Sequence, residues 1–178
     1  KNAPAQDFCD DFIFGNYQDS EKIKEFTDKI NLVTFEFENI PFETLKKINE
    51  IKKVLPNPEI NKIIQNRLTE KDFVNKLNIQ TTKYKLIRNK KDLEDSLDFI
   101  PGILKTSTLG YDGKGQFKIN SKNDLDIIKI NLNKEYIFEK LIDLKKEMSV
   151  IITRFGPKKY EIYEPIENEH EDQILKYS

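Results

Sequence analysis

Short apolar runs alternate with capped helix-forming segments at the start of the chain, and this alternation restricts the fold more than any other feature. Residues 32–37 are β-branched and aromatic and predict a strand, and residues 12–14 are a shorter strand candidate. Asp19 supplies a cap for a helix, and Pro41 fits the first turn of a second helix. Strand, helix, strand, helix is typical of parallel α/β layers. We therefore expect a parallel α/β domain over residues 1–55.

Two prolines, Pro56 and Pro58, mark the next boundary, and we expect residues 54–58 to form a linker. The pattern beyond it is richer in hairpins and predicts an α+β organisation. The strands expected there are 84–87, 103–106, 116–119, 136–142, 149–155 and 159–163, with helices at 60–65, from 69, at 92–99 and at 121–130.

Composition excludes several classes of protein. One cysteine, Cys9, and one histidine, His170, leave no Cys-rich zinc site and no multi-histidine metal centre, so a metal would need oxygen ligands. The 30 basic and 31 acidic residues give a net charge of -1, which argues against a nucleic-acid binder. No apolar run approaches the roughly 20 residues that a membrane helix needs.

Glycine is rare and clustered. Three of the six glycines, Gly110, Gly113 and Gly115, lie within six residues. One interpretation is a plain hairpin turn, because Asp112-Gly113 is a strong hairpin signal. The other is an anion-binding loop, since such loops expose backbone N–H groups and Lys114 could join them. Lys105 favours the second interpretation, because an ammonium in an apolar strand needs an anion.

Acidic residues offer weaker signals. Glu139 follows the apolar run 136–138, and Glu147 stands at the head of the strand expected next; each alone is more often a solvated edge charge. A lone histidine such as His170 is usually a surface residue or a hydrogen-bonded polar one. Glu36 and Glu38 are expected on one face of the strand 32–37, near its carboxyl end, where α/β sheets bind ligands.

Taken together, these segments resemble the 5-(carboxyamino)imidazole ribonucleotide synthase family, the ATP-grasp ligases of bacterial purine biosynthesis. The resemblance covers nearly the whole chain in order. It is carried by residues 33–41 (VTFEFENIP), 65–71 (QNRLTEK), 104–106 (LKT), 110–116 (GYDGKGQ), 138–140 (FEK), 147–151 (EMSVI), 167–170 (ENEH) and 174–175 (IL).

The resemblance implies a fold and an activity. The fold is a partial pre-ATP-grasp domain over residues 1–55, the ATP-grasp small subdomain over 59–132 and the start of the large subdomain over 133–178. The activity is carboxylation of aminoimidazole ribonucleotide with bicarbonate and ATP, which gives ADP and phosphate and uses Mg²⁺. It also implies a cytoplasmic enzyme that acts on small molecules, away from nucleic acid and membranes, and that can form a homodimer.

The same resemblance assigns candidate residues. It implies that Arg67 and Lys105 contact ATP and that Gly110, Tyr111, Asp112, Gly113, Lys114 and Gly115 form the flap over the phosphates. The hinge that addresses adenine corresponds to Glu139, Lys140, Leu141 and Ile142, the ribose contact to Glu147, and a further nucleotide contact to His170. Glu36, Tyr111, Asp112 and Lys114 are the candidates for the bicarbonate and aminoimidazole side, and no metal ligand is assigned within the chain.

The departures from the family lie at the two ends. The chain opens on Lys1 and reads as a fragment without the family's Gly-rich opening strand and its downstream Mg²⁺-binding Glu and Asn. We therefore expect no useful turnover from these 178 residues alone. The alternatives are another ATP-grasp ligase, which leaves residues 36–39 unexplained, and a non-catalytic nucleotide-binding remnant.

Overall fold

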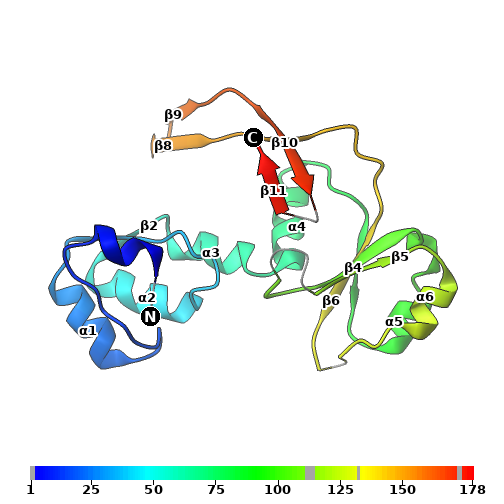
Figure 1. Cartoon of the computed structure of the whole chain (residues 1–178), viewed down its shortest axis with the longest axis horizontal. Helices are drawn as coiled ribbons and strands as arrows, with labels where there is room; N and C mark the ends of the chain where they lie inside the picture. Colours follow the sequence, from blue (N-terminus) through cyan, green and yellow to red (C-terminus); the bar gives the residue numbers. More distant parts are fainter. Residues whose placement is uncertain (1–2, 111–114, 132, 172–173) are drawn as a thin grey trace. The chain divides into compact units, whose positions relative to one another are not determined.

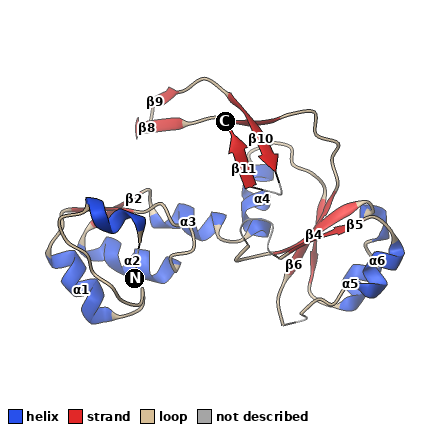
Figure 2. Cartoon of the chain, in the orientation of Figure 1, coloured by secondary structure: helices blue, strands red, loops and turns tan. Residues whose placement is uncertain are grey.

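A computed structural model of the chain describes residues 3–110, 115–131, 133–171 and 174–178 (Figure 1). The chain divides into two compact units, Lys1–Ile79 and Gln80–Ser178. Each unit has its own set of helices and strands (Figure 2). The two units are therefore described separately.

The first unit is helical with a small parallel sheet. Its elements are η1 (Pro4–Phe8), α1 (Ser20–Asp28), β1 (Leu32–Thr34), α2 (Phe42–Ile51), β2 (Lys53–Leu55), α3 (Pro58–Ile64) and α4 (Arg67–Lys76). β1 and β2 pair in parallel, with Val33 opposite Val54. The parallel α/β organisation expected for this region is confirmed, whereas the strand expected at residues 12–14 is wrong, because that segment is irregular.

The core of this unit forms where α2 meets the two strands. Val33, Leu45, Ile48 and Val54 are buried, and the apolar face of α1 packs against them. α1 begins as expected, because the carboxylate of Asp19 accepts hydrogen bonds from the N–H groups of Glu21 and Lys22.

Residues 54–58, expected to form a linker, do not connect two independent bodies. Val54 is buried at 2% exposure, and Pro58 is the first residue of α3, which packs against α2. The expectation missed the pairing of residues 53–55 with β1, because three-residue strands carry little periodic signal.

β1 is shorter than expected, and α3 holds the loop that follows it. The strand ends at Thr34, so the expected alternation of Glu36 and Glu38 on one strand face is wrong. The side-chain amide of Gln65 donates to the carbonyl of Glu38 at 2.7 Å, and that of buried Asn61 donates to the carbonyl of Ile40 at 3.1 Å. These side-chain bonds satisfy two backbone carbonyls of the loop.

The second unit is built mainly from antiparallel strands. Its elements are β3 (Tyr84–Ile87), α5 (Lys90–Glu94), η2 (Leu97–Phe99), β4 (Gly102–Thr106), β5 (Gln116–Ile119), α6 (Lys122–Ile127), β6 (Tyr136–Lys140), β7 (Glu147–Ser149), β8 (Ile152–Gly156), β9 (Lys159–Ile162), β10 (Ile166–Glu171) and β11 (Ile174–Tyr177). The strands form a four-stranded sheet in the order β3-β6-β4-β5, a three-stranded sheet β11-β10-β7 and the pair β8-β9. The α+β organisation expected after the first domain is confirmed.

One face of the four-stranded sheet holds the core of this unit. Ile87, Leu104, Ile119, Tyr136 and Phe138 pack with Leu93 of α5 and Leu125 of α6. The hydroxyl of Ser121 accepts from the N–H of Asp124, whose carboxylate accepts from the Ser121 N–H, so the two residues form a capping box. The sequence predicts this start for α6, but the helix ends at Ile127 rather than at residue 130.

Candidate functional site

The second face of the four-stranded sheet carries an ion pair. The Lys105 ammonium, on β4, donates to a carboxylate oxygen of Glu139, on β6, at 2.8 Å. Lys105 lies opposite Ile137 in the ladder, so Glu139 is its diagonal neighbour on the same face. The two side chains are 22% and 9% exposed. The anion that the sequence predicts for Lys105 is present here as a carboxylate, and a role toward phosphate stays a prediction.

The register defines this second face completely across the four strands. Its members are Tyr84, Leu86, Ile137, Glu139, Ile103, Lys105, Gln116 and Lys118. Tyr84, Leu86, Ile103 and Lys105 are half-buried, whereas Ile137 and Glu139 on the central strand β6 are buried. The ion pair therefore lies on the side of the sheet away from the helices α5 and α6.

The connection that contains the glycine cluster leaves β4 and enters β5 next to Lys105. β4 and β5 form a hairpin in which Lys105 lies opposite Gln116, so the connecting loop starts next to the Lys105 ammonium. Gly115 has φ +75, a conformation that favours glycine, and its carbonyl accepts from the Thr106 N–H at 3.0 Å. A Cβ on Gly115 would also lie 3.0 Å from the Thr106 hydroxyl. The hairpin interpretation is confirmed in topology, and it is compatible with anion binding.

The central residues of the loop fall outside the described part of the chain. These are Tyr111, Asp112, Gly113 and Lys114. Their expected roles in the flap and on the substrate side stay predictions, as does that of Gly110.

The hinge after β6 has several backbone groups already engaged. The Lys140 N–H donates to the carbonyl of Lys83 and the Leu141 N–H to the carbonyl of Pro101, both at 2.9 Å. The Thr82 hydroxyl donates to the Lys140 carbonyl at 2.7 Å. A purine edge would therefore have to use other groups of the hinge, which include those of the exposed Ile142.

A second polar group lies on the three-stranded sheet. Glu147 on β7 and His170 on β10 approach to 3.4 Å between Oε2 and Nδ1. Asn168 lies opposite Glu147, and its amide donates to the Ser149 hydroxyl at 2.6 Å. The Oδ1 atom of Asn168 is buried without a partner among the described residues. Ser149 and Asn168 were not predicted from the sequence, although residues 168 and 170 share a strand face by spacing alone.

The other candidates lie in the first unit. Arg67 is the first residue of α4, where the side chain of Asn66 caps the helix by accepting from the N–H groups of Leu68 and Thr69. Glu36 is exposed in the loop after β1. The structure brings Lys105 to Glu139 and Glu147 to His170.

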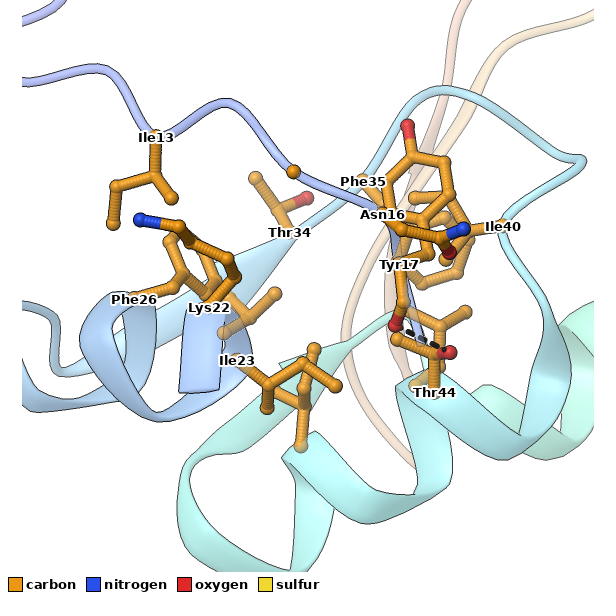
Figure 3. A pocket seen from close by; sticks show the side chains of 14 residues that line it. Ile13, Asn16, Tyr17, Lys22, Ile23, Phe26, Thr34, Phe35, Ile40 and Thr44 are labelled. Carbon is orange, nitrogen blue, oxygen red and sulfur yellow. Dashed lines mark hydrogen bonds between the residues drawn. The ribbon is translucent and has the colours of Figure 1, made fainter. Parts of the chain in front are cut away.

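A cavity of about 210 Å³ lies in the first unit, and no predicted site residue is among the described residues that line it (Figure 3). Its walls come from α1, α2, β1 with the loop that follows it, and the segment before α1, and they are mostly apolar. Thr44 of α2 donates to the Tyr17 carbonyl at 2.9 Å at one end of this cavity. The one charged side chain among its described lining residues is Lys22, whose ammonium is already paired with Glu25 at 2.7 Å, so the cavity offers little charge to a phosphate-bearing ligand.

Two further features limit what the described residues can do. Nowhere among them do three or more His, Cys, Asp or Glu side chains gather as a metal site would require. The helices of the described ranges are also too short or too polar to cross a lipid bilayer.

Comparison with known proteins matches two domain families. Residues 72–178 match the ATP-grasp domain, and residues 1–65 match the ribonucleotide synthetase preATP-grasp domain. The N5-carboxyaminoimidazole ribonucleotide synthase of Staphylococcus epidermidis (strain ATCC 12228) is 32% identical over 179 residues, which cover 98% of this chain and 48% of the relative. The chain thus spans about half the length of the curated relatives it matches.

Solved structures give the same correspondence. An N5-carboxyaminoimidazole ribonucleotide synthetase in complex with ADP superposes with a TM-score of 0.91 at 32% identity, covering 98% of this chain and 47% of that chain. The Staphylococcus aureus N5-carboxyaminoimidazole synthetase complexed with ADP gives a TM-score of 0.87 at 29% identity, covering 97% of this chain and 47% of that one.

Proposed function

This chain belongs to the ATP-grasp family, with a pre-ATP-grasp domain ahead of its ATP-grasp domain, and we propose that it forms the nucleotide-binding part of an N5-carboxyaminoimidazole ribonucleotide synthase. The reaction is the ATP- and bicarbonate-dependent carboxylation of 5-aminoimidazole ribonucleotide. ADP in the similar structures supports an adenine nucleotide as the ligand.

The observation that carries this proposal is the position of the Lys105–Glu139 pair beside the glycine loop. Phosphoryl transfer depends mainly on positioned cations and backbone dipoles that neutralise the charge on the transferring group. Lys105 supplies a point charge at the start of the loop, and the loop from Gly110 to Gly115 supplies N–H groups over the phosphates. Arg67 is the second proposed cation at the nucleotide.

The remaining nucleotide contacts follow the same logic. The hinge from Glu139 to Ile142 meets the adenine edge, with Ile142 in a better position than the engaged N–H groups of Lys140 and Leu141. The carboxylate of Glu147 accepts from the ribose hydroxyls, and His170 lies next to it. Glu36, Tyr111, Asp112 and Lys114 are proposed for the bicarbonate and aminoimidazole side.

We propose Mg²⁺ as a cofactor only because the resemblance to the family implies it. Because the described residues gather no set of ligands for it, no step is assigned to a metal held by this chain. A cytoplasmic location and a homodimer are proposed on the same ground.

Isothermal titration of the chain with ATP tests the nucleotide site. We expect wild-type protein to bind ATP and Lys105→Ala to lose about tenfold or more in affinity, because a charge-assisted contact to phosphate is worth about 1.5–3 kcal/mol. Lys122→Ala is the matched control, since Lys122 is an exposed lysine of the same unit. Unchanged ATP affinity in a folded Lys105→Ala protein would remove Lys105 from the phosphates.

A further inference from the structure

The carboxylate of Glu139 has a position that the hinge backbone does not explain. The hinge role uses main-chain groups, yet the Glu139 side chain is 9% exposed and points to Lys105 across the sheet. An ordinary surface pair of the same unit, Arg88 with Glu135, is far more open, at 64% and 45% exposure. The Lys105–Glu139 pair is thus a desolvated pair on the face that carries the proposed nucleotide site.

One ammonium has to serve two anions at this position, if the proposed function holds. A half-buried lysine without a counter-ion is costly, so Lys105 needs Glu139 when no nucleotide is present. When a phosphate reaches the same ammonium, the carboxylate and the phosphate repel each other. Lysine can change partner easily, because its ammonium is a compact charge with three donors on a flexible stem.

We propose that Glu139 is a positioning residue for Lys105, a resident counter-ion that holds the ammonium beside the glycine loop until a nucleotide phosphate takes its place. Glu139 therefore opposes nucleotide binding by its charge while it keeps the cation in position. Binding of nucleotide and pairing with Glu139 are linked equilibria, so weakening one strengthens the other.

The test removes the negative charge of the Glu139 side chain and keeps its size and shape. Glu139→Gln retains an acceptor oxygen for Lys105 but removes the negative charge. We expect its affinity for ADP, measured by titration calorimetry on the full 178-residue chain, to rise about fivefold or more over wild type. We also expect its nucleotide-free form to unfold at lower urea concentration. Glu135→Gln is the control, and it should leave both quantities unchanged.

A second measurement uses the wild-type protein and does not depend on the variant folding. In protein labelled with ¹³C and ¹⁵N, ADP should shift the carboxyl carbon signal of Glu139 and leave that of Glu135 in place.

Each outcome decides a different point. Equal or weaker ADP affinity in Glu139→Gln, or an unmoved Glu139 signal in ADP-bound wild type, would show that phosphate does not replace Glu139 as the partner of Lys105. The proposed nucleotide site would be unaffected by that result. If the wild-type chain does not bind ADP, both the proposed nucleotide site and the replacement of Glu139 by phosphate are wrong.

Discussion

Gly102 lies at the start of β4, where the chain leaves no room for a side chain. A Cβ there would lie 2.5 Å from the Phe99 carbonyl oxygen, 2.6 Å from the Glu139 carbonyl oxygen and 2.7 Å from the Phe138 ring. Two of these atoms belong to the backbone of neighbouring segments and cannot move cheaply. Glycine at this position lets β4 approach β6 closely enough to bring Lys105 and Glu139 together.

Gly102→Ala should therefore destabilise the protein by about 1–3 kcal/mol, the usual cost of overpacking. Urea unfolding followed by far-UV circular dichroism measures the difference. Gly156→Ala is the control, because nothing lies within 4 Å of a Cβ there. A Gly102→Ala protein as stable as the control would show that β4 can shift without cost.

For single residues, the sequence could predict that Lys105 needs an anion, but not that Glu139 supplies it. An ammonium in the apolar run around Lys105 had to meet an anion, and that much follows from the cost of burying charge. The choice of Glu139 depends on the register of β4 against β6, which joins residues 34 positions apart. For the same reason Asn168 and Ser149 were missed, since only the pairing of β7 with β10 puts them side by side.

Among the elements, α6 depends on a pH-sensitive cap. The pKa of Asp124 lies below its ordinary value of 3.8, mainly because its carboxylate accepts hydrogen bonds from the N–H groups of Asn120 and Ser121. A lowered carboxyl pKa in the folded state gives stability that is present above the unfolded pKa and is lost as the pH falls through the folded pKa.

We expect wild-type protein to lose this part of its stability as the pH falls below about 3.8. In Asp124→Asn, stability at neutral pH is already lower and its decline toward pH 3 is shallower. Urea unfolding at pH 7 and pH 3 for both proteins measures this. Parallel declines in the two proteins would show that the cap does not titrate with folding.

Element types were largely predictable from caps and periodicity, whereas element ends were not. The strands at 84–87 and 116–119 have the expected bounds, because clear β-forming runs lie between turn residues. β1 ends three residues early, and the loop that follows is held by the side-chain amides of Asn61, in α3, and of Gln65, the C-cap of α3. Such tertiary hydrogen bonds leave no local pattern in the sequence.

At the level of the whole molecule, the boundary between the two compact units falls between Ile79 and Gln80 in the sequence. Residues 77–83 lie outside any helix or strand and follow α4 directly. Residues 52–58, by contrast, are tied into the first unit by β2 and α3. The limits expected for the family domains, 1–55, 59–132 and 133–178, stay a prediction.

Limited trypsin digestion should therefore cut first after Lys76 or Lys83 and only later after Lys52 or Lys53, because proteases act on irregular, exposed backbone. Mass spectrometry of the first fragments identifies the site. Early cleavage after Lys52 or Lys53 would mean that β2 and α3 open more readily than the segment between the units.

The central claim is that the second face of the four-stranded sheet, and not the apolar cavity of the first unit, receives an adenine nucleotide. Amide hydrogen exchange of the chain with and without saturating ADP tests it directly, since bound nucleotide protects the backbone that it covers. We expect added protection in β4 around Lys105 and in the hinge around Ile142. Protection confined to the cavity between α1 and α2, or no added protection anywhere, would contradict it.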